Sequence, residues 1–303
     1  MTNPLRLATR GSDLATTQSS WVARAVHEAS GRASELVIVE TTGDRKQVGA
    51  LAEVGNIGLF TKEVQEAVLD GRADYAVHSL KDLPAEQTPG LCCAAIPLRE
   101  DARDYLLIRR EAYAADAQSE LPVQNGGVVG TASARRAAFL AAIAPNLQSK
   151  VLRGNVPTRV AKLRAGDYDA ILLAGAGLRR LELDLSDLEV LPLEHSLWPC
   201  APGQGALALE CRAEDQETRE CLALIHDQAT AMAVHIERTL LRRLGGGCGL
   251  PLGAFLERGQ DPEYRLHAAL GPVAEGDPLL RHAEVASDTL DGLAEEAFEA
   301  LMA

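Results

Sequence analysis

Hydrophobic residues alternate between short apolar runs and longer helical patterns through the first hundred residues of the chain. Short apolar runs predict strands, and apolar positions three to four residues apart predict helices. The pattern gives, in chain order, strand Leu5–Thr9, helix Asp13–Ala29, strand Glu35–Thr41, helix Lys62–Asp70 and strand Tyr75–Leu80. The polar run over 99–104 then predicts a connector to a second unit.

The second unit repeats this rhythm. Strand Gly127–Gly130 leads into helix Ala134–Ala144, and strand Val151–Arg153 leads into a helix with Pro157 in its first turn, where a missing N–H costs nothing. Ala170–Ala174 reads as a buried strand. Strands alternating with helices indicate an α/β lobe with a largely parallel sheet.

A short sequence repeat links the two units. Gly71–Asp74 precedes one predicted strand and Gly166–Asp169 precedes another, with glycine first and aspartate last in both. The repeat is compatible with a duplicated lobe, and two shared residues do not decide the question.

The pattern changes near residue 228. Helix Ala229–Leu244 is followed by a glycine-rich loop and by strand-like runs near 250–257, 264–270 and 279–286, and a last helix starts at Asp288. Gly259, Pro262 and Gly276 separate these runs as hairpin turns. The sequence therefore predicts two α/β lobes and a small C-terminal α+β domain.

Composition and charge narrow the possible functions. With 303 residues, 47% hydrophobic and only 4% aromatic, the chain is long enough for two or three domains with aliphatic cores. A formal net charge of -13 argues against a broad nucleic-acid surface, so any anion site must be local. The N-terminal residues show no signal-peptide pattern and the six cysteines no CxxC spacing, which predicts a cytoplasmic protein with reduced thiols and without structural zinc.

Cys248 is flanked in the sequence by glycines rather than by residues with bulky side chains. Glycines occupy 245–247 and 249, and glycine lets the backbone approach a large ligand closely. Taken alone, the cysteine is better explained as a small buried residue in a tight turn. The helix before it ends there, and a helix C-terminus raises a thiol pKa, so the loop is ill suited to a cysteine hydrolase and better suited to a single alkylation.

Asp82 follows the predicted strand Tyr75–Leu80 directly. Ligands of open α/β sheets bind at the carboxyl ends of the strands, which would place this carboxylate in a cleft. The alternative is a solvated turn aspartate paired with Lys81. His78, within the strand, is expected to be a hydrogen-bonded core residue without a catalytic role.

Arginines recur at strand ends and in first helical turns. Arginine in a first turn opposes the helix dipole, which suggests an anionic ligand with carboxylates. Thr131 and Ser133 offer further donors. The arginines in question are Arg10, Arg135, Arg136, Arg153, Arg159, Arg179 and Arg180. No nucleotide-binding glycine motif and no metal-type His/Cys spacing accompanies them.

Six motifs, taken together, resemble the porphobilinogen deaminase family over nearly the whole chain. They are Ala8–Ser12, Val77–Pro84, Val129–Arg136, Leu152–Arg159, Gly203–Ala206 and Gly246–Gly253. The resemblance implies two periplasmic-binding-protein-like α/β lobes and a C-terminal domain with a three-stranded antiparallel sheet. The implied domains are 1–98 with 199–222, then 99–198, then 223–303.

The resemblance also implies a reaction and a cofactor. The family deaminates porphobilinogen and joins four molecules head to tail into the linear tetrapyrrole hydroxymethylbilane, within haem and chlorophyll biosynthesis. The growing chain is built on a dipyrromethane primer, a thioether on the cysteine that matches Cys248. No nucleic acid or membrane partner is implied, and the expected state is a cytoplasmic monomer.

Individual residues acquire roles by the same resemblance. Asp82 stabilises the cationic pyrrole left by loss of ammonia and accepts the proton released after coupling, and Phe60 lies near the stacked rings. Carboxylates of cofactor and substrate are implied to contact Arg10, Ser12, Ser79, Lys81, Thr131, Ser133, Arg135, Arg136, Arg153, Gly154, Arg159 and Gln204.

The chain departs from the family pattern at two places. In the loop before Phe60 it has Glu53 and Ile57 where the family often has lysines, and Asn56 where the family often has glycine, so a lysine contribution from this loop is in doubt. Ala132 stands where a second serine is usual. A two-lobe solute-binding protein without catalysis is the alternative on fold grounds, and a thiol hydrolase using Cys248 lacks a neighbouring base.

Overall fold

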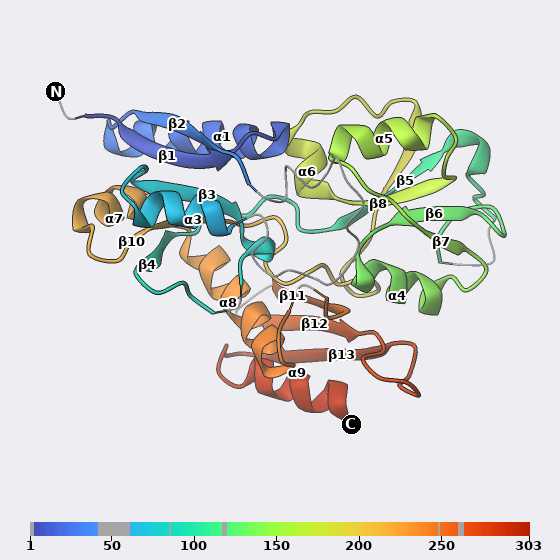
Figure 1. The fold of residues 1–303 in the computed structure, drawn as a ribbon. Coiled ribbons are helices and arrows are strands. Elements are labelled where there is room, and N and C mark those ends of the chain that lie inside the picture. The colour runs from blue at the N-terminus through green and yellow to red at the C-terminus, as the bar shows by residue number, and fades with distance from the viewer. Residues whose placement is uncertain (1–2, 42–60, 85, 117–119, 248, 260–263) are drawn as a thin grey trace. The chain divides into compact units, whose positions relative to one another are not determined.

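Two compact units make up the chain in the computed structural model. The first comprises Met1–Glu100 with Gly205–Met232, and the second comprises Asp101–Gln204 with Ala233–Ala303. The structure describes residues 3–41, 61–84, 86–116, 120–247, 249–259 and 264–303 (Figure 1).

The first unit contains a five-stranded sheet. Its order is β2 (Ser34–Val39), β1 (Leu5–Arg10), β3 (Tyr75–Ser79), β10 (Leu207–Arg212) and β4 (Leu91–Ala95). The first three strands are parallel, and β10 runs antiparallel to both of its neighbours. Helices α1 (Asp13–Ser30), α3 (Lys62–Leu69) and α7 (Gln216–Ala223) belong to the same unit. The core includes Leu7, Val22 and Tyr75.

The second unit contains a five-stranded sheet of the same design. Its order is β7 (Gln148–Val151), β6 (Val128–Thr131), β8 (Ala170–Ala174), β5 (Asp104–Arg109) and β9 (Leu188–Pro192). Again three strands are parallel and the fourth runs antiparallel to its neighbours. Strand order and strand direction therefore agree between the two lobes.

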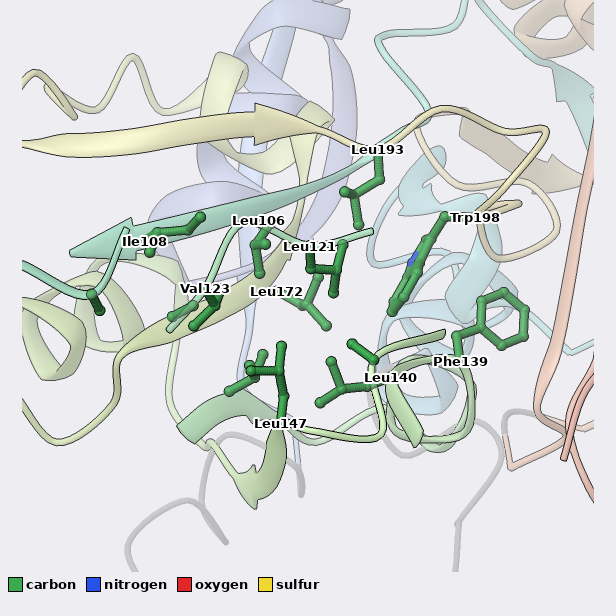
Figure 2. Close-up of a cluster of buried hydrophobic side chains, with 14 of the residues drawn as sticks. Leu106, Ile108, Leu121, Val123, Phe139, Leu140, Leu147, Leu172, Leu193 and Trp198 are labelled. Atoms are coloured by element: carbon green, nitrogen blue, oxygen red, sulfur yellow. The ribbon is translucent and has the colours of Figure 1, made fainter. Parts of the chain in front are cut away.

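Both faces of this second sheet are covered, which explains its nearly continuous apolar strands. Leu106 and Leu172 pack with α4 (Ala134–Ile143) in one cluster, whereas Leu107 and Ile171 pack with α5 (Val156–Arg164) and α6 (Gly175–Arg180) in another. Alternate residues of a strand point to opposite faces. Figure 2 shows the α4 cluster, with Phe139 and Trp198 beside each other at one end.

The sequence repeat corresponds to a repeated set of hydrogen bonds. Asp74 Oδ2 accepts from the backbone N–H of Arg6 in β1 at 2.7 Å, and Asp169 Oδ2 accepts from that of Val128 in β6 at 2.8 Å. Gly71 and Gly166 both have positive φ, 73° and 85°, at the end of the preceding helix. The duplicated lobe is thus confirmed by the structure.

The C-terminal part forms the predicted antiparallel sheet of three strands. These are β11 (Leu252–Arg258), β12 (Tyr264–Leu270) and β13 (Arg281–Ser287). Helices α8 (Gln228–Arg243) and α9 (Leu293–Met302) supply the remaining apolar side chains of its core, and α9 lies along the sheet in Figure 1. The predicted fold class, two α/β lobes and an α+β domain, is confirmed.

Two predicted boundaries are wrong by three or more residues. The strand predicted at Val151–Arg153 is β7, Gln148–Val151, whose four residues are all exposed at the sheet edge and therefore carry no apolar pattern. The last helix starts at Leu293 rather than Asp288, because Gly292 takes a left-handed conformation immediately before it.

The three-stranded sheet packs directly on the second lobe. Ala269 of β12 belongs to the cluster that contains Leu106, Phe139 and Trp198, and the N–H of Ala254 donates to the carbonyl of Cys200 at 2.8 Å. These contacts join both parts into one compact unit. The division into three separate domains stays a prediction.

Gly253 tests this packing. A Cβ at this position would lie 2.3 Å from the Pro199 carbonyl oxygen and 3.0 Å from Phe139 Cζ. We expect Gly253→Ala to lower the free energy of unfolding by about 1–3 kcal/mol, since overpacking forces the backbone to shift. Urea denaturation measures the change. Gly249→Ala is the control, because a Cβ there meets nothing within 4 Å among the described residues. Equal stability of both variants would contradict the packing.

Candidate active site

Asp82 lies where strand β3 ends. The short 3-10 helix η1, Leu80–Asp82, follows β3 directly, and the N–H of Leu80 donates to the carbonyl of Ala206 at 3.0 Å, which fixes the turn. The Asp82 side chain is exposed. No hydrogen bond or ion pair engages its carboxylate within the described part of the chain, so the alternative of a turn aspartate paired with Lys81 gains no support.

Other predicted residues gather at the same sheet edge. Because β1 and β3 are adjacent and parallel, Arg10 at the end of β1 lies at the same edge as Ser79 at the end of β3. Ser12 is the N-cap residue of α1. Gln18 of α1 donates to Ser79 Oγ at 3.2 Å. The first lobe thus brings together Arg10, Ser12, Ser79, Lys81 and Asp82.

The equivalent edge of the second lobe carries hydroxyls. Thr131 ends β6 and its Oγ1 accepts from the N–H of Ser133 at 3.2 Å. Ser133 is the N-cap of α4, with Oγ accepting from the N–H of Arg136 at 3.4 Å. A capping hydroxyl and the free N–H groups of a first turn favour an anion at this end of the helix.

Three predicted site residues converge on one buried carboxylate that the sequence analysis did not single out. Asp104, fully buried at the start of β5, accepts from Arg135 Nη2 at 2.7 Å, from Arg136 Nη2 at 2.7 Å and from Gln204 Nε2 at 2.7 Å. Trp198 Nε1 is a fourth donor, at 2.9 Å.

The charges in this cluster do not cancel. Burial by itself raises the pKa of the Asp104 carboxyl, but the Arg135 and Arg136 charges, with the hydrogen bonds, hold that pKa far below its ordinary value, so the group is ionised. Two guanidiniums face one carboxylate, which leaves one net positive charge. The buried Nε atoms of both arginines have no hydrogen-bond partner among the described residues.

Arg159 adds a second uncompensated cation. Its Nε donates to the Gly154 carbonyl at 2.7 Å, and no carboxylate of the described residues forms an ion pair with it. Burial and, second, the nearby Arg136 charge lower the pKa of the Arg159 guanidinium. Holding two like charges close together without enough opposing charge costs free energy. This arrangement therefore indicates a place for an anionic ligand. Arg153 precedes Gly154 in the loop between β7 and α5, and its side chain is exposed.

The glycine-rich loop is described on both sides of Cys248. The N–H of Gly245 donates to the Arg242 carbonyl and that of Gly246 to the Leu241 carbonyl, so α8 ends before the cysteine as predicted. Cys248 and Phe60 lie outside the described residues, as do Glu53, Asn56 and Ile57. The five cysteines of the described residues form no disulfide with one another.

His78 is a core residue, as predicted, and is 5% exposed. Its Nε2 lies 3.2 Å from Glu210 Oε2 but forms no hydrogen bond among the described residues, whereas the prediction was a hydrogen-bonded histidine. Glu210 Oε2 accepts from Gln65 Nε2 at 2.7 Å. Across the described ranges, no group of three His, Cys, Asp or Glu side chains is placed to hold a metal ion. No described helix is long and apolar enough to cross a membrane.

The family model and the curated relatives agree on one family. Residues 5–220 match the family model described as porphobilinogen deaminase, dipyromethane cofactor binding domain. Porphobilinogen deaminase of Brevibacillus brevis is 42% identical over 299 residues, covering 98% of this chain and 94% of that protein. The Phenylobacterium zucineum protein of the same name is 46% identical, covering 84% and 81%. Among solved structures, an ancestral cationic amino acid solute binding protein matches at 13% identity and a TM-score of 0.44, covering 80% and 91%.

Proposed function

The chain belongs to the porphobilinogen deaminase family, and on that premise we propose which of its residues bind substrate, carry the primer and assist the reaction. The activity is that of a hydroxymethylbilane synthase, a transferase that deaminates porphobilinogen and joins it into a linear tetrapyrrole. The matched domain binds the dipyrromethane cofactor. The alternative of a non-catalytic solute-binding protein is thereby set aside.

The second lobe fits such a cofactor by its charge. Each pyrrole ring of cofactor and substrate carries an acetate and a propionate, and the lobe holds Arg159 without a carboxylate partner and a net positive cluster at Arg135 and Arg136. The observation that carries this proposal is that Arg159 has no carboxylate partner among the described residues. When bound, the dipyrromethane supplies the ring to which the first substrate unit is joined.

We assign carboxylate binding to the residues at the second lobe's sheet edge. Arg136 and Arg159 supply the charge, and Thr131 and Ser133 supply hydroxyl donors. A hydrogen bond between charged groups contributes about 1.5–3 kcal/mol. Arg153, Gly154 and, in the first lobe, Arg10, Ser12, Ser79 and Lys81 complete the proposed set. Arg135 and Gln204 contribute through Asp104, to which they are bonded.

We assign the reaction itself to Asp82. Loss of ammonia leaves a positive charge on the substrate ring, and an exposed, unengaged carboxylate at a strand end can stabilise that charge and then accept the proton released on coupling. Fixed groups of this kind contribute about 2.7–4 kcal/mol to the transition state.

We assign the covalent attachment of the primer to Cys248. The C-terminus of α8 precedes it, and the partial negative charge of a helix C-terminus disfavours a thiolate. A single bond-forming event is compatible with such a thiol, whereas repeated nucleophilic turnover is not. We also propose a monomer in the cytoplasm, where the five described cysteines would stay reduced.

The attachment predicts a mass. Intact-protein mass spectrometry should give a chain heavier than its sequence by one dipyrromethane unit, and Cys248→Ala should give the bare sequence mass, since the thioether sulfur is gone. Cys93→Ala is the control and should keep the added mass, because Cys93 is an exposed cysteine elsewhere in the chain. Active enzyme of bare sequence mass would refute the tether.

The role of Asp82 predicts a defect in rate. Asp82→Ala should retain the added mass but lose about a hundred- to a thousandfold in kcat, the size expected for one preorganised electrostatic group. Asp70→Ala, at an exposed aspartate of the same lobe, should keep the rate. Steady-state assays of tetrapyrrole formation decide between them, and a wild-type kcat in Asp82→Ala would remove this residue from the mechanism.

The role of Arg159 predicts a loss of affinity without a loss of stability. Arg159→Leu should lower kcat/KM for porphobilinogen about 10- to 100-fold. The melting temperature should stay equal or rise, because an unpaired, half-buried charge is removed. Arg164→Leu on the same helix is the control, since Arg164 forms an exposed pair with Asp187 at 2.6 Å. Unchanged kinetics in Arg159→Leu would contradict the proposed carboxylate site.

A further inference from the structure

Asp104 accepts four side-chain hydrogen bonds in the described part of the second lobe. Its Oδ1 accepts from Arg136 and Gln204, and its Oδ2 accepts from Arg135 and Trp198, all at 2.7–2.9 Å. The carboxylate is 0% exposed. Two donors on each oxygen use the acceptor capacity of the group, so its position and orientation are fixed from four directions.

The two arginines are held equally firmly at their other nitrogen atoms. Arg135 Nη1 donates to the Pro199 carbonyl at 3.0 Å, and Arg136 Nη1 donates to the Leu172 carbonyl at 3.0 Å. The Arg135 guanidinium also lies over the Phe139 ring, 5.6 Å from its centroid, and Phe139 packs edge-to-face on Trp198. Both guanidiniums are therefore set in place before any ligand arrives.

The two arginines differ in what else they face. Arg135 is enclosed by Asp104, Phe139 and the 198–199 segment, and it is 4% exposed. Arg136 lies in the helix that follows β6, and Arg159 lies in the helix that follows its parallel neighbour β7, so both helices begin at the same sheet edge. The Arg136 charge lowers the pKa of Arg159, the cation without a carboxylate partner among the described residues. Arg136 also follows the capping Ser133 within the first turn of α4. Arg136 consequently belongs to the border of the anion site, and Arg135 to its interior support.

We propose that Asp104 is the positioning residue of the carboxylate site, acting through Arg136: it fixes this guanidinium beside Arg159 and cancels one of the two charges on Arg135 and Arg136. The inference rests on the proposed function of Arg159 and Arg136 as substrate-binding residues. Asp104 is not assigned contact with substrate, because its carboxylate is fully buried beneath the two guanidiniums.

The charge count explains why one carboxylate is present and not two. Without Asp104, two adjacent buried cations would repel each other and lack a counter-charge. With a second carboxylate, the pair would be neutral and the site would lose attraction for an anionic substrate. One aspartate leaves a single fixed positive charge at the edge that Ser133 and Arg159 share.

Asp104→Glu tests the positioning role, because it keeps the charge and moves the carboxylate by one methylene. We expect KM for porphobilinogen to rise about tenfold or more, since a small displacement of a binding group is costly, while kcat falls less than threefold. The fraction of purified chains that carry the dipyrromethane mass should also fall, which gives a readout independent of turnover.

Asp169→Glu is the matched control. Asp169 lies in the same lobe and pairs with Arg109 at 3.3 Å, but it contacts Val128 at the opposite end of β6 from Thr131. The Asp169→Glu variant should have a lower melting temperature than the wild type and a KM within twofold of the wild-type value. A rise in KM for Asp169→Glu as large as that for Asp104→Glu would overturn the proposal, because a general loss of stability would then explain both.

Two further variants keep the result decisive. If Asp104→Glu does not fold, Trp198→Phe removes only the indole donor, and a KM at least threefold above wild type supports the proposal while an unchanged KM overturns it. Arg159→Leu separates the two levels of the argument. If it raises KM and the Asp104 and Trp198 variants do not, the positioning role alone is wrong, and if it leaves KM unchanged, the carboxylate site itself is wrong.

Discussion

Uncompensated positive charge in the second lobe is the constraint on which the rest of the site depends. The chain as a whole carries a net charge of -13, so it repels anions at long range. At the edge formed by β6 and the first turn of α4, however, Arg135 and Arg136 share one carboxylate and Arg159 has none among the described residues. These arginines attract an anionic substrate locally, because surface charges farther than about 10 Å are screened by salt.

The two lobes share one strand arrangement but place side chains of opposite charge at their sheet edges. The Asp74 and Asp169 hydrogen bonds align β3 with β8, so that Ser79 corresponds to Ala174. Their antiparallel partners are Leu207 in the first lobe and Asp104 in the second. The first lobe therefore has an apolar residue where the second has the carboxylate that supports its arginines. Its own exposed carboxylate, Asp82, lies one short turn beyond β3.

The sequence was sufficient for the elements whose pattern is local, and insufficient for those that depend on distant partners. Parallel strands such as Tyr75–Ser79 and Ala170–Ala174 carry continuous apolar runs and were predicted closely. The antiparallel strand β5 was not, because its first residue, Asp104, belongs to a run of charged residues that reads as a connector. Its burial follows only from contacts with residues 31, 32, 94 and 100 positions away.

The same limit applies to the site. The unfavourable position of arginine in a first helical turn suggested an anionic ligand, whereas the structure shows the buried Asp104 as the partner of Arg135 and Arg136. Sequence alone does not distinguish a ligand from a buried aspartate. In the structure, Asp104 neutralises one of the two arginine charges, and the remaining positive charge is held next to Arg159.

Rigid charge is what binding of a polyanionic product requires, since groups already fixed in place need no reorganisation when each new ring arrives. A flexible, solvated lysine would give the same net charge but would lose conformational entropy with every carboxylate it bound. Buried arginines held by one carboxylate avoid this cost, and the same physical argument explains why the support of the site is hidden in the core, where local sequence patterns do not reveal it.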